Sequence, residues 1–269
     1  MKTRTLIQAV LFATLAGSAL SANAAVDHFH TIYATDFLAG GAGHVNAANT
    51  LATERFLGDI NTKFTAKNGA SVGNFGFKTV DGYTGVGVQG GASGNEIDIG
   101  QSISASFTNA ITNKDEGIFI TGFRLGALFD GPEFGDVNEK ARITATYFDN
   151  SVHSFTFTAV GEKKGVWSAL SPADSFMALS TSYKNVSEAE LGEGGVWDIT
   201  NPFGNNRIKG LSFTALTGAC GVISSRCGCN NQSDYTLISI SAVPEPETYA
   251  MMLVGLGLMG FAARRNKQA

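Results

Sequence analysis

The chain has little charge, little proline and almost no cysteine, and these shortages exclude several classes of protein. Charged residues make up 16% of the 269 residues, well below the usual quarter, which argues against a disordered acidic or basic tail protein. The formal net charge is -4 and no Lys or Arg run crosses the interior, so we expect no nucleic-acid partner. The 5 Pro beside 33 Gly favour many tight turns and exclude a collagen-like repeat.

Familiar catalytic motifs are absent as well. The sequence has no HExxH zinc motif, and the segment Gly91–Asn95 departs from the GxSxG elbow at its last position. We therefore expect a noncatalytic protein. An exported hydrolase stays open as an alternative, because sequence spacing does not reveal a carboxylate pair or a set of Ser, His and Asp side chains.

Residues 1–24 have the composition of a signal peptide. Lys2 and Arg4 come first, and an uncharged apolar stretch runs from Leu6 to Leu20. The small residues Ala22 and Ala24 then frame the point at which signal peptidase would cut. Charge, apolar length and small residues occur in the order of an export signal, so we expect cleavage after Ala24 and export of the remaining chain.

Residues 244–269 form a second targeting segment with three parts. Pro244, Glu245 and Pro246 precede an uncharged, mostly apolar stretch that ends at Ala263, and Arg264 and Arg265 follow it. As a helix this stretch would rise about 22 Å, short of the roughly 30 Å hydrocarbon core, which suits a transient anchor in the inner membrane. The basic end should stay in the cytoplasm and leave the proline motif just outside the membrane.

This arrangement resembles the PEP-CTERM sorting signal of Gram-negative bacteria. The resemblance implies recognition and cleavage by an exosortase, a membrane-embedded cysteine peptidase of bacteria that make extracellular polysaccharide. It further implies an inner-membrane intermediate and a final location at the cell surface or outside the cell. The expected partners are signal peptidase, the exosortase and extracellular polysaccharide.

Residues 25–243 form the body of the protein, and alternation of period two dominates it. Apolar residues of Phe155–Ala159 take one face and threonines the other, and Ile143–Tyr147 repeats the pattern. The intervening Asp149, Asn150 and Ser151 supply turn chemistry, so the two segments should form a hairpin. Further strands are expected over Phe75–Val80, Tyr83–Gln89, Ile103–Phe107, Ile118–Leu125, Ile208–Leu216 and Tyr235–Ala242.

Helix signals in the body are sparse. Thr50 is a candidate cap for a short helix from Leu51 to Asp59, and Ser187 is a candidate cap for another through Leu191. Many short strands with glycine-rich connections predict an all-β body, namely a β-sandwich of jelly-roll type. Several segments of the body also resemble patches of exosortase-dependent surface proteins, which implies a β-rich body and no catalytic residue; they are Gly94–Asp98, Leu128–Glu139, Asn201–Gly204 and Ser233–Leu237.

One acidic segment is a candidate cation site. Its oxygen-bearing side chains are those of Asp130, Glu133, Asp136, Asn138 and Glu139. Ca²⁺ prefers such oxygen ligands when thiols and imidazoles are missing, and Glu96 and Asp98 are candidate partners from elsewhere in the chain. The spacing departs from the EF-hand loop. The segment therefore indicates either a structural Ca²⁺ site or a solvated acidic loop.

The only three cysteines, Cys220, Cys227 and Cys229, lie close together in the sequence. In an exported protein we expect one intrachain disulfide from Cys220 to Cys227 or Cys229, because a bridge between the last two would be strained. The third thiol leaves an intermolecular bridge, a free thiol or a three-thiolate metal site open.

Aromatic residues raise a second function class, a carbohydrate-binding module. Trp167, Trp197, Tyr147 and Tyr183 are candidates for a platform on which sugar rings stack. The competing interpretation places them in the core of the sandwich, where aromatics on alternating strands usually lie.

Overall fold

The computed structural model describes residues 31–38, 51–56, 60–131, 137–175, 181–187, 195–219 and 232–243. These residues form 15 strands of one continuous antiparallel sheet and one short helix, α2 (Ala34–Leu38). The sheet curls over so that its two halves face each other as layers. The predicted all-β class and sandwich architecture are therefore confirmed.

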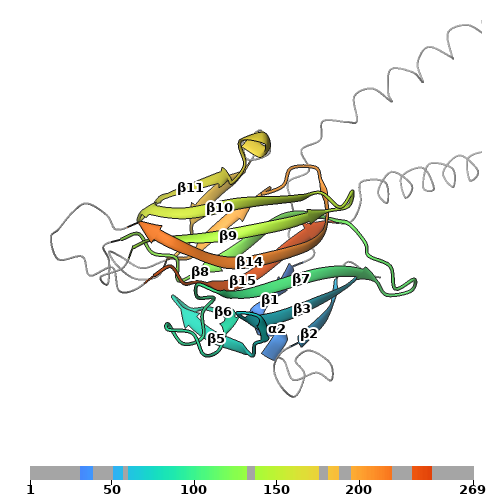
Figure 1. Cartoon of the computed structure of the whole chain (residues 1–269), viewed down its shortest axis with the longest axis horizontal. Coiled ribbons are helices and arrows are strands. Elements are labelled where there is room, and N and C mark those ends of the chain that lie inside the picture. The colour runs from blue at the N-terminus through green and yellow to red at the C-terminus, as the bar shows by residue number, and fades with distance from the viewer. Residues whose placement is uncertain are drawn as a thin grey trace, which may run out of the picture.

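The first layer is built around the long strand β14 (Arg207–Ala219). Residues Gly210–Thr214 pair with β9 on one side and with β7 on the other. Figure 1 shows the long strands β10, β9 and β14 side by side. The full order is β11 (Lys164–Ala169), β10 (Val152–Gly161), β9 (Asn138–Tyr147), β14, β7 (Gln101–Asn109), β3 (Ile60–Asn68) and β2 (Leu51–Phe56), with β4 (Ser71–Val72) turning back on β3.

The second layer is shorter and contains the strands nearest the two ends of the described chain. Its order is β12 (Ser182–Asn185), β13 (Trp197–Thr200), β8 (Ile118–Gly126), β15 (Thr236–Val243) and β1 (Thr31–Tyr33). Thr31 of β1 pairs with Ser241 of β15, so the first and last described strands are antiparallel neighbours. The layers are continuous because Arg207 and Ile208 of β14 pair with Phe119 and Ile118 of β8.

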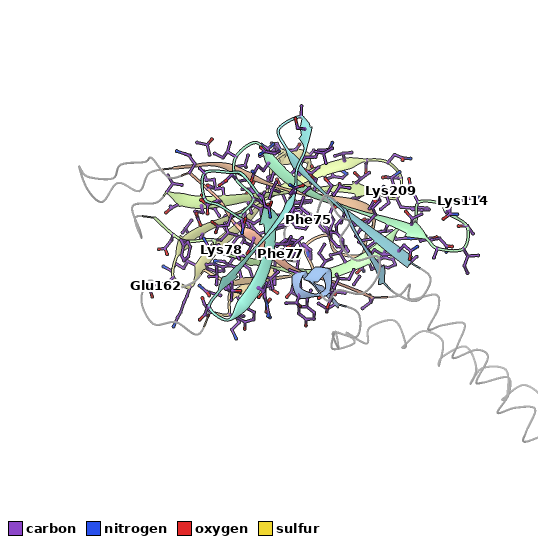
Figure 2. The ribbon with its side chains drawn as sticks, turned by 90° about the horizontal axis from the view of Figure 1, so that it is seen from below. Phe75, Phe77, Lys78, Lys114, Glu162 and Lys209 are labelled. Carbon is purple, nitrogen blue, oxygen red and sulfur yellow. The ribbon has the colours of Figure 1, made fainter. Side chains whose placement is uncertain are left out.

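A hairpin of β5 (Phe75–Val80) and β6 (Tyr83–Val88) extends the second layer. It joins through the pair of Val86 with Leu237 at the start of β15. Figure 2 views this side of the molecule from below and labels Phe75, Phe77 and Lys78 of β5. Phe75 and Val86 are fully buried, so the hairpin closes one end of the core.

Aromatic side chains fill the space between the layers. Phe123 of β8 contacts Phe213 of β14 edge to face, with 5.7 Å between ring centroids. The ring centroids of Phe157 of β10 and Trp197 of β13 lie 5.1 Å apart. Trp167, Trp197 and Tyr147 are all buried, which agrees with the core interpretation of these residues and not with a surface platform.

The predicted strands and the hairpin of β9 and β10 are present in the structure. Phe155 pairs with Ile143 and Phe157 with Ala141, and the predicted turn lies between the strands. The predicted helix from Leu51 to Asp59 is wrong, because Leu51–Phe56 forms β2 and pairs with β3 along its whole length. Pairing with a neighbouring strand here outweighs a local capping signal. The predicted helix after Ser187 lies outside the described residues.

Candidate functional site

Two rows of side chains cross the outer face of the second layer and form a groove. In the first row Asp198 of β13 is opposite Arg124 of β8, which is opposite Ser239 of β15, which is opposite Tyr33 of β1. The second row follows in the same register and contains Thr200, Gly122, Ser241 and Thr31. Residues two apart on a strand share a face, so both rows point outward together.

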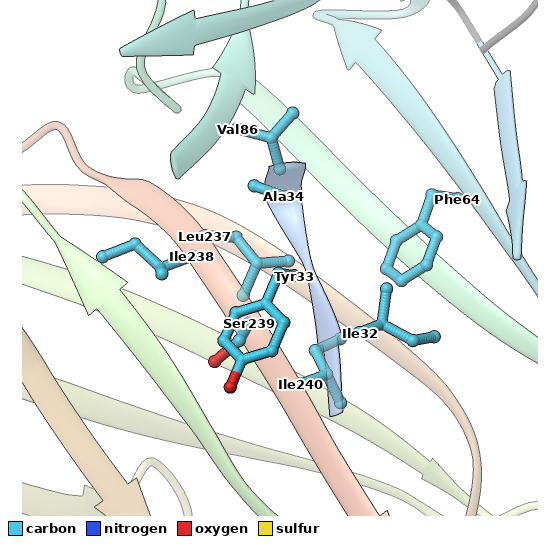
Figure 3. A pocket seen from close by; sticks show the side chains of 9 residues that line it. All are labelled: Ile32, Tyr33, Ala34, Phe64, Val86, Leu237, Ile238, Ser239 and Ile240. Carbon is cyan, nitrogen blue, oxygen red and sulfur yellow. The ribbon is translucent and has the colours of Figure 1, made fainter. Parts of the chain in front are cut away.

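The groove has a floor of small residues and larger residues at its rim. Gly122, Ser239 and Ser241 form the floor, and the groove has a volume of about 270 Å³. Ser239 and Ser241 are only 7% and 8% exposed because the neighbouring side chains stand higher. Figure 3 shows a neighbouring pocket that shares Tyr33 and Ser239 with the groove; there the ring of Tyr33 lies beside Ser239, whereas Ile32 points to the other side of the strand, towards Phe64.

Arg124 is the fixed cation of the groove. Its Nε and Nη2 donate hydrogen bonds to the two carboxylate oxygens of Asp198, at 2.5 and 2.9 Å. Its guanidinium carbon lies 4.8 Å from the centre of the Tyr83 ring. The hydrogen bonds that Arg124 donates to Asp198 raise the pKa of Arg124 above its ordinary value. The carboxylate cancels the charge, so the groove holds one bidentate ion pair and no net charge.

The groove does not hold an evident catalytic set. Its lining consists of hydroxyl groups, the Arg124 and Asp198 pair, Tyr33 and a few apolar side chains. Asp198 is the single carboxylate among these described lining residues, and they include no His or Cys. Hydrolysis of a glycoside commonly requires two carboxyl groups across the substrate. The described lining therefore offers hydroxyl groups and one ion pair to a ligand.

A Ser, His and Asp arrangement occurs at the start of β10, and a second carboxylate also contacts its serine. Nδ1 of His153 lies 2.8 Å from Oδ1 of Asp174, and Nε2 of the same imidazole lies 3.0 Å from Oγ of Ser151. However, the Ser151 hydroxyl donates to the carboxylate of Asp149 at 2.6 Å, and the Ser151 N–H donates to the same oxygen. The Ser151 hydroxyl thus lies between the Asp149 carboxylate and the His153 imidazole, and the carboxylate competes with the imidazole for its proton.

A second group of polar residues is a buried carboxyl cluster beneath the β5–β6 hairpin. Glu96 is 1% exposed, and its Oε2 accepts a hydrogen bond from Nζ of Lys78 at 2.8 Å. Burial and the neighbouring carboxylate of Asp234 raise the pKa of Glu96 to about 8, although Lys78 opposes the shift. Burial and Asp234 therefore favour the protonated form of the Glu96 carboxyl group at neutral pH.

Asp234 connects this cluster to the predicted acidic segment. Its carboxylate accepts a 2.5 Å hydrogen bond from the Ser93 hydroxyl, and its N–H lies 3.5 Å from Oε1 of Glu139. Ser93 also donates its N–H to Asp98 at 3.3 Å. Sequence reasoning missed Asp234 and Lys78, because both approach the cluster from segments distant in the chain.

The side chains predicted to bind Ca²⁺ have structural roles where they are described. Asn138 accepts the N–H of Gly131 at 2.9 Å, and Glu139 accepts that of Phe129 at 2.5 Å. Asp130 is partly buried, which raises its pKa. Glu133 and Asp136 lie outside the described residues. Among the residues that the structure describes, no three His, Cys, Asp or Glu side chains are placed to hold a metal, so the Ca²⁺ site stays a prediction.

The other predicted site residues lie beyond the described ranges. Cys220, Cys227 and Cys229 fall between residues 219 and 232, and Pro244, Glu245, Pro246, Arg264 and Arg265 follow residue 243. Within the described ranges, none of the helices is long and apolar enough to cross a membrane.

Comparison with known proteins identifies the C-terminal segment but not the body. No curated protein and no solved structure matches the chain. The family model described as the PEP-CTERM protein-sorting motif matches residues 242–266, which include the Pro244–Pro246 motif and both arginines. The chain thus carries a PEP-CTERM protein-sorting motif, which marks it as a protein exported to the cell surface in an exosortase-dependent manner.

Proposed function

We propose that this chain is a noncatalytic surface protein of a Gram-negative bacterium. An exosortase cleaves it at the Pro-Glu-Pro motif and leaves the β-sandwich body outside the cell. The observation that carries this proposal is the position of the sorting motif, which begins at Ala242 inside β15. Cleavage after Val243 would remove the tail and keep every described strand.

The environment of β15 supports release of an intact body. Ser239 and Ile240 of β15 pair with β8 on one side and with β1 on the other, and most of its side chains are buried. A strand held on both edges does not depend on the residues that follow it. The folded body should therefore tolerate loss of the tail, which a cleaved sorting signal requires.

The noncatalytic assignment is supported by the two polar sites. The groove contains a single ion pair among hydroxyl groups, and the carboxyl cluster is closed off by Lys78 and the β5–β6 hairpin. The Ser151 hydroxyl is held by a turn carboxylate. Each arrangement favours stability or binding over proton transfer to a substrate.

Mass spectrometry of the surface fraction tests the sorting proposal. The full chain is expressed in its native host and in a strain without the exosortase. We expect a mature form that starts at Ala25 and has lost the segment after the proline motif, and we expect this form only where the exosortase is present. Replacing both Pro244 and Pro246 by Ala should block processing, whereas Thr248→Ser is the matched control. An intact Ala269 in the surface pool of the wild type would overturn the proposal.

A further inference from the structure

We propose that the groove formed by β13, β8, β15 and β1 binds a neutral saccharide. The site differs from the Trp167, Trp197, Tyr147 and Tyr183 set considered from the sequence. Its assignment to surface polysaccharide, as opposed to free sugar, rests on the proposed extracellular function.

The two rows present mainly hydroxyl groups as their hydrogen-bonding groups. Side-chain hydroxyl groups of Thr31, Thr200, Ser239 and Ser241 and the phenol of Tyr33 face one surface. A hydroxyl group donates and accepts, as the hydroxyl groups of a sugar do. A ligand with many hydroxyl groups can therefore satisfy the groove in several orientations, which a purely apolar or purely anionic ligand cannot.

The floor also offers a free hydroxyl group. Ser241 shares a 2.9 Å hydrogen bond with Thr31. The Ser239 hydroxyl makes no hydrogen bond to any other described residue and lines the groove. It is therefore available to a group that enters the groove, as donor or as acceptor.

The charges of the described lining residues are balanced. The guanidinium of Arg124 is neutralised by its bidentate contact with Asp198. Among the described lining residues, an anionic ligand would meet the Asp198 carboxylate beside Arg124, and a cationic ligand would meet Arg124 itself. The ring of Tyr83 stacks against the Arg124 guanidinium. This contact holds the remaining donors and acceptors of the Arg124–Asp198 ion pair in fixed positions. Fixed polar groups without net charge favour a neutral ligand.

The shape of the groove also suits a small sugar. The absence of a side chain at Gly122 opens the floor between Thr200 and Ser241. A Cβ atom at Gly122 would lie 2.7 Å from the carbonyl oxygen of Ile199, so close packing of β8 on β13 requires the glycine. Tyr33, 44% exposed, stands at one end of the first row as a flat wall. The 270 Å³ groove is near the lower end of the range for small-ligand sites, roughly 300 to 1,000 Å³, which suits one or two sugar rings.

Calorimetry with purified full chain in detergent tests the proposal. The probes are neutral tetrasaccharides of β-1,4-glucose, α-1,4-glucose, β-1,3-glucose and β-1,4-xylose, the free monosaccharides, polygalacturonate as an anionic control, and the polysaccharide of the native host. We expect binding of at least one neutral saccharide. Binding of the polymer and the tetrasaccharide but not of the monosaccharide would place the source in the surface polysaccharide.

Variants locate the site. Tyr33→Ala removes the wall and should weaken binding by about tenfold. Ser239→Phe places a ring on the floor and should abolish binding. Val152→Ala is the control because Val152 is 60% exposed and does not line the groove. Unchanged melting temperatures confirm that each variant is folded, and Ser239→Val serves if Ser239→Phe does not fold.

Several results would overturn the assignment. They are no binding of any neutral saccharide by the folded wild type, preference for polygalacturonate, or binding that Ser239→Phe leaves unchanged. Self-association of the wild type that Ser239→Phe abolishes would assign the groove to a second copy of the chain instead. These measurements use purified protein, so they do not depend on whether the exosortase cleaves the chain in its host.

Discussion

A single carboxyl group, that of Glu96, should make the stability of the protein depend on pH. Its pKa is raised from 4.5 to about 8 by burial and by Asp234. Between these two values the folded state binds more protons than the unfolded state. The free energy of unfolding therefore falls as the pH rises from 4.5 to 8, and the contribution of Glu96 is fully present only below 4.5.

Glu96→Gln tests this dependence because glutamine imitates the protonated carboxyl group. The free energy of unfolding of the wild type should fall by on the order of a few kcal/mol over this pH interval. The free energy of unfolding of the variant should depend much less on pH. Urea denaturation at pH values from 4.5 to 8 measures both. Glu162→Gln, at an exposed turn, is the control and should keep the wild-type slope. Equal slopes for wild type and Glu96→Gln would refute the assignment.

Ser151 offers a direct test of the noncatalytic proposal. Because the Ser151 hydroxyl donates to Asp149 at 2.6 Å, we expect that His153 does not activate Ser151 as a nucleophile. We expect no covalent labelling of Ser151 by a fluorophosphonate probe, as judged by peptide mass spectrometry. The variant Asp149→Ala frees the hydroxyl and tells whether the turn carboxylate is what holds it. Rapid labelling of Ser151 in the wild type would show that the protein has an activated serine and would contradict the proposal.

At the scale of the element, the sequence predicts strands well where apolar and polar residues alternate. The β9–β10 hairpin has both a clear pattern and a turn of Asp149, Asn150 and Ser151 between its strands, and the register agrees with it. Residues Leu51–Phe56 have no such alternation and carry a helix signal in Thr50, yet six residue pairs with β3 make them a strand. Local signals are decisive only where no neighbouring strand competes with them.

The groove could not be predicted from the sequence for a different reason. Tyr33, Arg124, Asp198 and Ser239 come from four strands, and only the register of the folded sheet aligns them in one row. Each of these residues is common on the solvent-facing side of a strand, so none of them alone indicates a binding site. The aromatic residues that did attract notice, Trp167 and Trp197, are buried, because large flat side chains fill the space between the layers more often than they face solvent.

The central strand β14 should carry the largest share of core stability. Phe213 is fully buried, contacts Phe123 of the opposite layer and lies on the strand that pairs with both β9 and β7. Phe213→Ala should destabilise the protein by about 3 to 5 kcal/mol through lost burial and a cavity. Val160→Ala removes a side chain that is 41% exposed and should cost about 0.5 kcal/mol or less. Urea unfolding of both variants decides this, and equal losses would contradict a central role for β14.

At the scale of the whole molecule, the sequence separates a sorted tail from a folded body, and the structure shows how closely the two adjoin. The matched motif begins at Ala242, and β15 continues to Val243. No linker therefore separates the last strand from the proline motif. Under the cleavage that we propose, the exosortase would act within a few residues of a folded sheet, and the edge of the body near Val243 would lie close to the membrane during processing.

Because Thr31 pairs with Ser241, the first and last strands of the described body lie next to each other. A loop of about four residues from Val243 back to Thr31 would form an ordinary hairpin, and new ends could be opened at the exposed turn of Glu162 and Lys163. Such a circular permutant should keep a β-rich circular dichroism spectrum and a melting temperature close to that of the parent, because neither strand order nor core packing changes. The order in which the ribosome makes the strands is then separable from the order in which the sheet arranges them.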